Sequence, residues 1–170
     1  SPQKVTVVES KTHPLGTTPK QREYQFVIIS YNLVSSLEDN LHMMEFGMVI
    51  CDESHYLKSA KAKRTKSLMR VMKRVRRLLM LSGTPALSRP VELFTVLNIL
   101  DPRKWNSSKD FIARYCRAKK KKGKKMKPGA EFKGASNTHE LHLILTDTLM
   151  IRRLKGDILK NLPKKHREIV

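Results

Sequence analysis

The sequence predicts an α/β protein, because short apolar runs alternate with helical patterns along the chain. Four runs lack polar alternation, as do strands of a parallel sheet covered on both faces: residues 4–8, 26–30, 47–51 and 78–82. With 170 residues, 39% of them hydrophobic, the chain has the size of one ordinary domain. We therefore expect one domain, or part of one, with a parallel sheet flanked by helices.

The clearest helical pattern covers residues 60–77 and has two opposite faces. Side chains that recur at about 100° per residue place apolar residues on one face and basic residues on the other. The apolar face consists of Leu68, Val71, Met72 and Val75. The basic face consists of Lys66, Arg70, Lys73 and Arg77.

Three more helices are predicted in the second half of the chain. One starts at Pro90, a residue suited to a first turn, and ends before Asp101 and Pro102. The next follows Ser107 and Ser108, with Phe111, Ile112, Tyr115 and Cys116 directed inward.

The last helix follows Asn137, whose side chain is expected to cap it, with Glu140 three residues on. Its apolar residues are Leu141, Ile144, Leu145 and Leu149.

Residues 117–134, "RAKKKKGKKMKPGAEFKG", break these patterns with Lys, Gly and Pro. Such a composition is typical of an exposed basic loop. We therefore expect three parts: residues 1–116 with the strands, the basic loop at 117–134, and a helical end at 135–170.

The charge points to a polyanionic partner. The formal net charge is +20, so nucleic acid is the first partner to consider, although charge alone cannot separate DNA from RNA or from an anionic membrane. No apolar run approaches the ~20 residues that cross a bilayer, so a membrane is not expected. The two cysteines form no CxxC pair and the six histidines show no ligand spacing, so we expect reduced thiols and no histidine metal site.

Two carboxylates, Asp52 and Glu53, directly follow the strand at 47–51. Ligands of open parallel sheets bind at the carboxyl ends of the strands. One carboxylate there can hold Mg²⁺ against nucleotide phosphates while its neighbour orients a water molecule. The alternative is an acidic pair that only opens a loop or caps the next helix.

A second polar segment, Ser82-Gly83-Thr84, follows the strand at 78–82 and is expected at the same edge of the sheet. Small hydroxyl side chains there can relay a hydrogen-bond change between a phosphate site and a second ligand. A plain turn is the alternative, since Ser, Gly and Pro favour turns.

Five segments together resemble the first ATPase lobe of the Swi/Snf-like group of DNA translocases. They are "DESH", "LSGTPALSRPVELF", "RYC", "GASNTHEL" and "MIRRLKGDILKNLPKK". Within this group, the sequences of these segments are most similar to the annealing-helicase subgroup. The resemblance implies the later half of a RecA-like lobe, with ATP and Mg²⁺ as cofactors, DNA as partner and the nucleus as location.

The resemblance also implies roles for single residues. Asp52 matches the Mg²⁺-binding carboxylate, Glu53 the residue that activates water, and His55, with Ser82, Gly83 and Thr84, the coupling motifs. The segment near the tracked DNA strand corresponds to Ser30, Tyr31 and Asn32, although the family usually has Asp at position 32. A basic pair near the end of the lobe corresponds to Arg152 and Arg153.

The phosphate loop GxxxxGK[ST] of this family is missing from the 170 residues. The nearest match, residues 129–136, has Ala135 where the lysine must be. The resemblance places the loop before Ser1 and the second lobe after Val170. We therefore expect this chain to need the rest of its ATPase core, to be inactive alone, and to leave an apolar edge beside the strand at 78–82 unpaired.

Residues 58–77 contain ten Lys or Arg and no acidic residue. They favour sequence-independent contact with DNA phosphates, although a solvated helix face is the alternative. The lysine loop is open to the same two interpretations and to a nuclear-import role.

The sequence thus predicts part of an ATP-dependent DNA translocase or annealing helicase acting on forked or branched DNA. A non-catalytic basic DNA-binding or scaffold module remains the alternative, and a DExH RNA helicase fits the "SGTPALSRP" segment less well.

Overall fold

The structure of the chain is a computed structural model that describes residues 4–15, 24–83, 89–116 and 134–153. It divides into two compact units, Ser1–Ser136 and Asn137–Val170. Thr84 and most of the predicted basic loop lie outside the described residues. In the described ranges, no helix has the length and apolar character needed to cross a membrane.

Four short strands form in the first unit where the sequence predicts them: β1 (Val5–Val8), β2 (Phe26–Ile29), β3 (Met48–Cys51) and β4 (Arg77–Met80). β1 pairs with β2 in parallel, and β3 pairs with β4 in parallel, with Met48 opposite Arg77. The strands make two two-stranded sheets where one sheet was expected. The α/β fold class is confirmed, and it is consistent with a partial RecA-like lobe.

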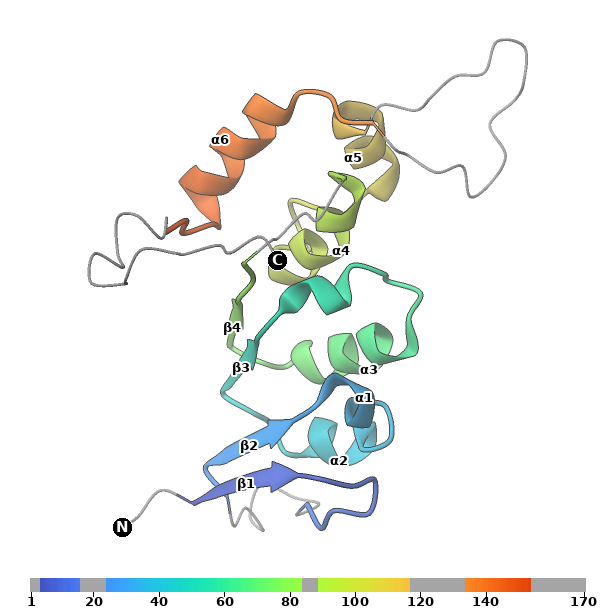
Figure 1. The fold of residues 1–170 in the computed structure, drawn as a ribbon, viewed down its shortest axis with the longest axis vertical. Coiled ribbons are helices and arrows are strands. Elements are labelled where there is room, and N and C mark those ends of the chain that lie inside the picture. Colours follow the sequence, from blue (N-terminus) through green and yellow to red (C-terminus); the bar gives the residue numbers. More distant parts are fainter. Residues whose placement is uncertain (1–3, 16–23, 84–88, 117–133, 154–170) are drawn as a thin grey trace, which may run out of the picture. The chain divides into compact units, whose positions relative to one another are not determined.

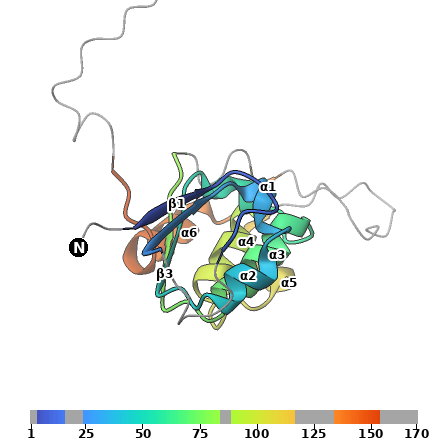
Figure 2. The ribbon, with the colours of Figure 1, turned by 90° about the horizontal axis from the view of Figure 1, so that it is seen from below.

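Helices cover one side of these strands. α1 (Tyr31–Val34) and α2 (Glu38–Met43) follow β2, the 3₁₀ helix η2 (Ser54–Leu57) follows β3, and α3 (Lys63–Met72) precedes β4. α3 packs against α1 and α2, and Figures 1 and 2 show these helices on one side of the strands. The core between them contains Val8, Leu15, Val34, Leu37, Leu41, Met44, Cys51, Leu57, Leu68, Val71 and Met72.

The opposite face of the strands is exposed, so the prediction of strands covered on both faces was wrong. Burial alternates along each strand, because the described helices pack against one face only. The outward side chains, between 41% and 57% exposed, are Val5, Val7, Phe26, Ile28, Met48, Ile50, Leu79 and Leu81. We call these eight residues the open sheet face.

The prediction of a single helix over residues 60–77 was also wrong at its end. α3 ends at Met72 with Lys73 as its C-cap, and the N–H of Val75 then donates to the carbonyl of Met72. Arg77 is the first residue of β4, because residues 77–80 are extended to pair with β3. Arg77 therefore does not share a helix face with Lys66 and Arg70.

α4 (Val91–Leu100) and α5 (Ser108–Tyr115) form as predicted. The Ser107 hydroxyl caps α5 by accepting the N–H of Asp110 at 3.2 Å. Phe111 and Tyr115 are buried, and both rings contact the ring of Trp105.

Hydrogen bonds join the chain segments on either side of the predicted basic loop. The N–H of Ser136 donates to the carbonyl of Tyr115 (3.0 Å), and the Ser136 hydroxyl donates to that of Arg114 (2.8 Å). Ser136 thus lies beside the end of α5, within the first unit.

The second unit contains α6 (Thr138–Thr148), at the predicted place. The expected side-chain cap by Asn137 was wrong: the backbone of Asn137 is left-handed (φ 48°), and its side chain makes no capping hydrogen bond. A left-handed Asn is tolerated because its short polar side chain adapts to this conformation.

Candidate functional site

Asp52 and Glu53 form a sharp turn at the carboxyl end of β3. Glu53 has a left-handed backbone (φ 47°, ψ 49°), which is uncommon for a residue with a side chain. The turn leads directly into η2, and both acidic residues are exposed. The pair therefore stands at the strand end where ligands of parallel sheets bind.

Hydrogen bonds hold the peptide between these two residues at both ends. Its N–H, that of Glu53, donates to Asp52 Oδ1 at 2.9 Å. Its carbonyl, that of Asp52, accepts the hydroxyl of Tyr31 at 2.7 Å. Tyr31 lies in α1 directly after β2, so this contact joins two strand ends that are 21 residues apart in sequence.

Aromatic side chains line the other side of the turn. His55 stacks on Tyr56, with ring centroids 4.8 Å apart, and its Nδ1 lies 3.1 Å from Glu53 Oε2. The geometry of this close contact does not meet that of a hydrogen bond, so Nδ1 has no hydrogen-bond partner among the described residues.

Tyr56 connects this side of the turn with two other helices. The centroid of its ring lies 5.8 Å from that of Tyr31 in α1. The guanidinium of Arg64 in α3 lies over the Tyr56 ring, 5.6 Å from its centroid. Arg64 Nε also donates to the carbonyl of Tyr56 at 3.3 Å.

The end of β4 is fixed to the same turn. The N–H of Leu81 donates to the carbonyl of Cys51 (2.9 Å), and the N–H of Ser54 donates to the carbonyl of Leu81 (2.8 Å). These bonds bring the start of the predicted coupling segment, Ser82 and Gly83, to the strand edge that carries the acidic pair. A Cβ atom added at Gly83 would meet no atom within 4 Å, so packing does not require glycine there.

Burial changes the acidity of two groups behind the turn. It raises the pKa of the Cys51 thiol to about 11, and a hydrogen bond with Tyr31 offsets part of this rise. Burial is also the main reason that the pKa of Tyr31 is raised, with Cys51, Asp52 and Glu53 adding to it. Both groups remain protonated at neutral pH, so Tyr31 is a permanent donor.

The donor set at the turn suits a magnesium ion that is bound mainly by other ligands. Mg²⁺ in nucleotide sites takes one or two carboxylates and completes its shell with phosphates and water. Asp52 is exposed and uses Oδ1 for the Glu53 N–H, which leaves its second oxygen available for such a role. No group of three His, Cys, Asp or Glu side chains that could hold a metal occurs in the described ranges.

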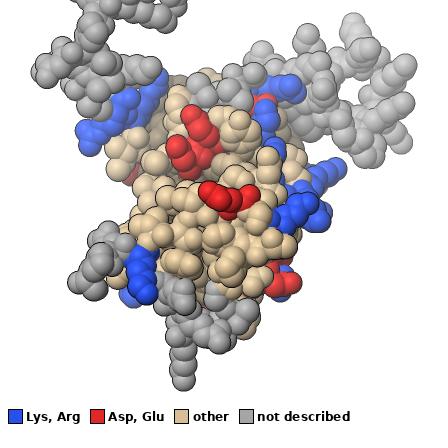
Figure 3. Space-filling model, turned by 60° about the horizontal axis from the view of Figure 1, so that its bottom comes forward, with Lys and Arg blue, Asp and Glu red and all other residues tan. Residues whose placement is uncertain are grey.

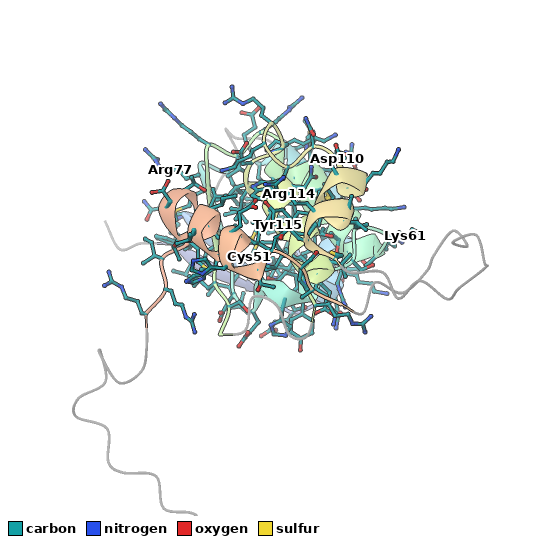
Figure 4. The ribbon with its side chains drawn as sticks, turned by 90° about the horizontal axis from the view of Figure 1, so that it is seen from above. Cys51, Lys61, Arg77, Asp110, Arg114 and Tyr115 are labelled. Carbon is teal, nitrogen blue, oxygen red and sulfur yellow. The ribbon has the colours of Figure 1, made fainter. Side chains whose placement is uncertain are left out.

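The predicted DNA-binding residues of the first unit come from three places: the start of α1, α3 with its C-terminal end, and β4. Ser30 and Asn32 are exposed beside Tyr31, and Lys66 and Lys73 are exposed on and after α3. In Figure 4, Arg77 and Lys61 project on opposite sides of the view, although both come from the basic stretch at 58–77. Figure 3 shows one face of the molecule, on which uncharged side chains cover a large area.

Arg70, a predicted DNA-binding residue, forms ion pairs with two acidic residues. Its Nη1 lies 3.0 Å from Glu38 and 2.7 Å from Asp39, both in α2. These hydrogen bonds raise the pKa of Arg70 and lower that of Glu38. Arg152 and Arg153 are exposed in the second unit.

Sequence reasoning missed the contributions of Tyr56 and Arg64 to this site. In the sequence, Arg64 is one of ten basic residues at 58–77, and Tyr56 follows "DESH" without a spacing that predicts a contact. Their pairing with each other and with Tyr31 depends on the packing of α1, η2 and α3, which a single sequence does not specify.

Comparison with known proteins places this geometry in a family context. The model of the SNF2-related domain matches residues 3–170. The human "DNA annealing helicase and endonuclease ZRANB3" is 38% identical over an alignment of 172 residues, which covers 99% of this chain.

Relatives with another name match at similar levels. The "SWI/SNF-related matrix-associated actin-dependent regulator of chromatin subfamily A-like protein 1" is 43% identical in Drosophila melanogaster over 87% of the chain. The Xenopus laevis protein of that name is 41% identical over 84% of the chain. The chain spans 15% of the human relative's length, and 19% and 14% of the other two.

Proposed function

The chain belongs to the SNF2-related domain family, and from this premise we propose that it forms part of the ATPase motor of a DNA annealing helicase or related DNA translocase. The observation that carries the proposal is the Asp52–Glu53 turn at the end of β3, hydrogen-bonded to the end of β4. The name of the human relative, a DNA annealing helicase, supports this choice of activity. Forked or branched DNA in the nucleus is the proposed setting.

In this proposal the two carboxylates divide the work of ATP hydrolysis. Asp52 would hold Mg²⁺ through its second oxygen, and the ion would supply positive charge against the phosphates of ATP. Glu53 accepts a hydrogen bond from the attacking water and orients it toward the γ-phosphate. Adjacency matters here, because one peptide sets the directions of both side chains.

Coupling of hydrolysis to movement is assigned to the residues around the turn. His55 Nδ1 lies 3.1 Å from Glu53 Oε2. Ser82 and Gly83 directly follow Leu81, whose carbonyl accepts the N–H of Ser54. Thr84, outside the described residues, completes this set. A change in phosphate contacts at the turn would reach the end of β4 through these short hydrogen bonds.

DNA is proposed to bind through its phosphates, without sequence preference. The exposed candidates are Ser30 and Asn32 after β2, Lys66 and Lys73 at α3, and Arg152 and Arg153 after α6. The formal charge of +20 supports a polyanionic partner. Arg77 and Arg70 are weaker candidates, because Arg77 lies in β4 and Arg70 is paired with acidic residues.

The test is Glu53→Gln in the full-length protein, with Glu9→Gln as a control for an exposed Glu outside the site. The Glu53 variant should bind ATP like the wild type but lose about 10²-fold or more in kcat, since it loses a group that acts on the water. The control should keep wild-type turnover. A Glu53 variant within about threefold of wild-type kcat would reject the role of Glu53.

The second candidate function is a basic DNA-binding or scaffold module without ATPase activity. The formal net charge of +20 favours it, because contact with DNA phosphates does not need ATP hydrolysis. ATP hydrolysis by the full-length protein separates the two candidates. The 170-residue chain by itself is expected to show no Mg²⁺-dependent hydrolysis in either case, because no phosphate loop holds the nucleotide.

A further inference from the structure

Tyr31 makes a contact that its sequence neighbours do not explain. Its hydroxyl reaches from the start of α1 to the carbonyl of Asp52, at 2.7 Å. The carbonyl of Asp52 thus has a fixed donor that comes from a different strand end.

The peptide that Tyr31 holds is the one that controls both carboxylates. Its carbonyl accepts from Tyr31, and its N–H donates to Asp52 Oδ1 at 2.9 Å. Rotation of this peptide would turn the Asp52 side chain and change the left-handed backbone of Glu53 together. Since left-handed backbone is unfavourable for Glu, the turn needs contacts of this kind to keep its shape.

The ring of Tyr31 supports the same turn from its second side. It contacts the ring of Tyr56 at 5.8 Å, and Tyr56 stacks on His55 at 4.8 Å. His55 in turn lies 3.1 Å from the carboxylate of Glu53. A hydroxyl contact and a chain of ring contacts therefore lead from one tyrosine to both acidic residues.

We propose that Tyr31 is a positioning residue, which orients the Asp52–Glu53 peptide for ATP hydrolysis and links it to the β2–α1 junction. Ser30 and Asn32, on either side of Tyr31, are candidates for DNA contact, so DNA bound there would act on the hydrolytic turn through the Tyr31 hydroxyl. Tyr31 has this role only if the proposed function holds.

The experiment is steady-state ATP hydrolysis by the full-length protein with saturating DNA, for wild type and Tyr31→Phe. Phe keeps the ring contact and removes only the hydroxyl. We expect kcat to fall by about tenfold or more, because a small displacement of a reacting group has a large effect on rate, while KM for ATP stays within about threefold. Rates are divided by the concentration of sites that bind a fluorescent ATP analogue, which removes the contribution of unfolded protein.

Tyr24→Phe is the matched control, since the Tyr24 hydroxyl makes no hydrogen bond to the described residues; it should behave as wild type. A second readout is Tyr31→Phe in a Glu53→Gln background. If Tyr31 acts through the turn, the second substitution should add less than about twofold, whereas independent structural damage would multiply the two losses.

The possible results separate the two proposals. Equal kcat per binding site for Tyr31→Phe and wild type, or losses that simply multiply, would overturn the role of Tyr31 and leave the proposed function standing. A wild-type full-length protein that does not hydrolyse ATP with DNA would overturn both.

Discussion

Glu53 illustrates how much of this site depends on single backbone positions. Its left-handed conformation turns the chain from β3 into η2, so that the carboxylates of Asp52 and Glu53 follow a buried Cys51 without entering the core. The Tyr31 hydroxyl and Asp52 Oδ1 hold the peptide between the two acidic residues. The acidic pair is thus a constrained turn instead of the start of a loose loop.

Sequence reasoning identified the acidic residues but not the contacts that hold them. The position of Asp52 and Glu53 follows from where an apolar run ends, which a sequence states directly. The contacts of Tyr31 and Tyr56 join segments 25 residues apart, and their geometry depends on packing. At Asn137 the residue type predicts a side-chain cap for α6, but its backbone is left-handed and its side chain makes no capping hydrogen bond.

Cys51 provides a test of burial behind the turn. With its pKa raised to about 11, its rate of alkylation should keep rising about tenfold per pH unit between about pH 7.5 and 9.5, because the thiolate is the reactive form. A cysteine in a short peptide is the control and should level off near its own pKa, about 8.5. The rates are measured by mass spectrometry of the Cys51 peptide under native conditions.

The same shift has a consequence for stability with a definite sign. A thiol whose pKa is raised by folding stabilises the protein fully below its unfolded pKa, and this contribution is lost as the pH rises through about 11. A Cys51 labelling rate that levels off near pH 9 would contradict the burial of this thiol in solution.

At the scale of elements, strand and helix positions were predictable, whereas ends and surroundings were not. Each strand lies within two residues of its predicted run, because β-branched and aliphatic runs are a strong local signal. Helical periodicity alone extended α3 to residue 77, although pairing with β3 recruits Arg77 into β4. The short helices α1 and α2 have too few residues for periodicity to reveal them.

The pairing of α2 with α3 leads to a prediction about DNA binding. Lys66→Gln in the full-length protein should lower the salt slope of DNA binding by about one, the value for one lost phosphate contact. Arg70→Gln should lower it by less, because Glu38 and Asp39 already pair with Arg70. The measurement is DNA affinity between about 50 and 200 mM salt.

Lys109→Gln, on the exposed side of α5, serves as a control of equal charge change. If Arg70→Gln lowers the slope by as much as Lys66→Gln, the α2–α3 ion pair does not shield Arg70 from DNA. If neither variant changes the slope, the α3 surface is merely solvated.

At the scale of the whole molecule, the open sheet face is the largest departure from the prediction. Parallel sheets are normally covered on both sides, and large exposed apolar patches on soluble proteins mark interaction sites or promote aggregation. The apolar runs of the sequence locate the strands, but they do not specify which face of each strand the described helices cover. The eight side chains remain half-exposed as a result.

This face predicts how the 170-residue chain behaves by itself. It should bind a hydrophobic dye and aggregate, and the substitutions Ile28→Lys and Ile50→Lys should reduce both effects, since these side chains are 56% and 57% exposed. Val8→Lys, at a buried position on the other face of β1, is the control and should unfold the protein. Dye fluorescence and light scattering measure the outcome. Unchanged dye binding in the double Lys variant would mean that the face is covered in solution.

We propose that the Asp52–Glu53 turn drives the ATP-dependent rewinding of DNA by the full-length protein. The most direct measurement is ATP-dependent rewinding of a DNA bubble, held open by a single-strand binding protein, by the wild-type full-length protein and by Glu53→Gln at equal DNA occupancy. If this proposal is correct, the wild type rewinds DNA with ATP and not without it, and Glu53→Gln loses about 10²-fold or more in rate. Rewinding by Glu53→Gln at the wild-type rate, or rewinding by the wild type that does not depend on ATP, would contradict it.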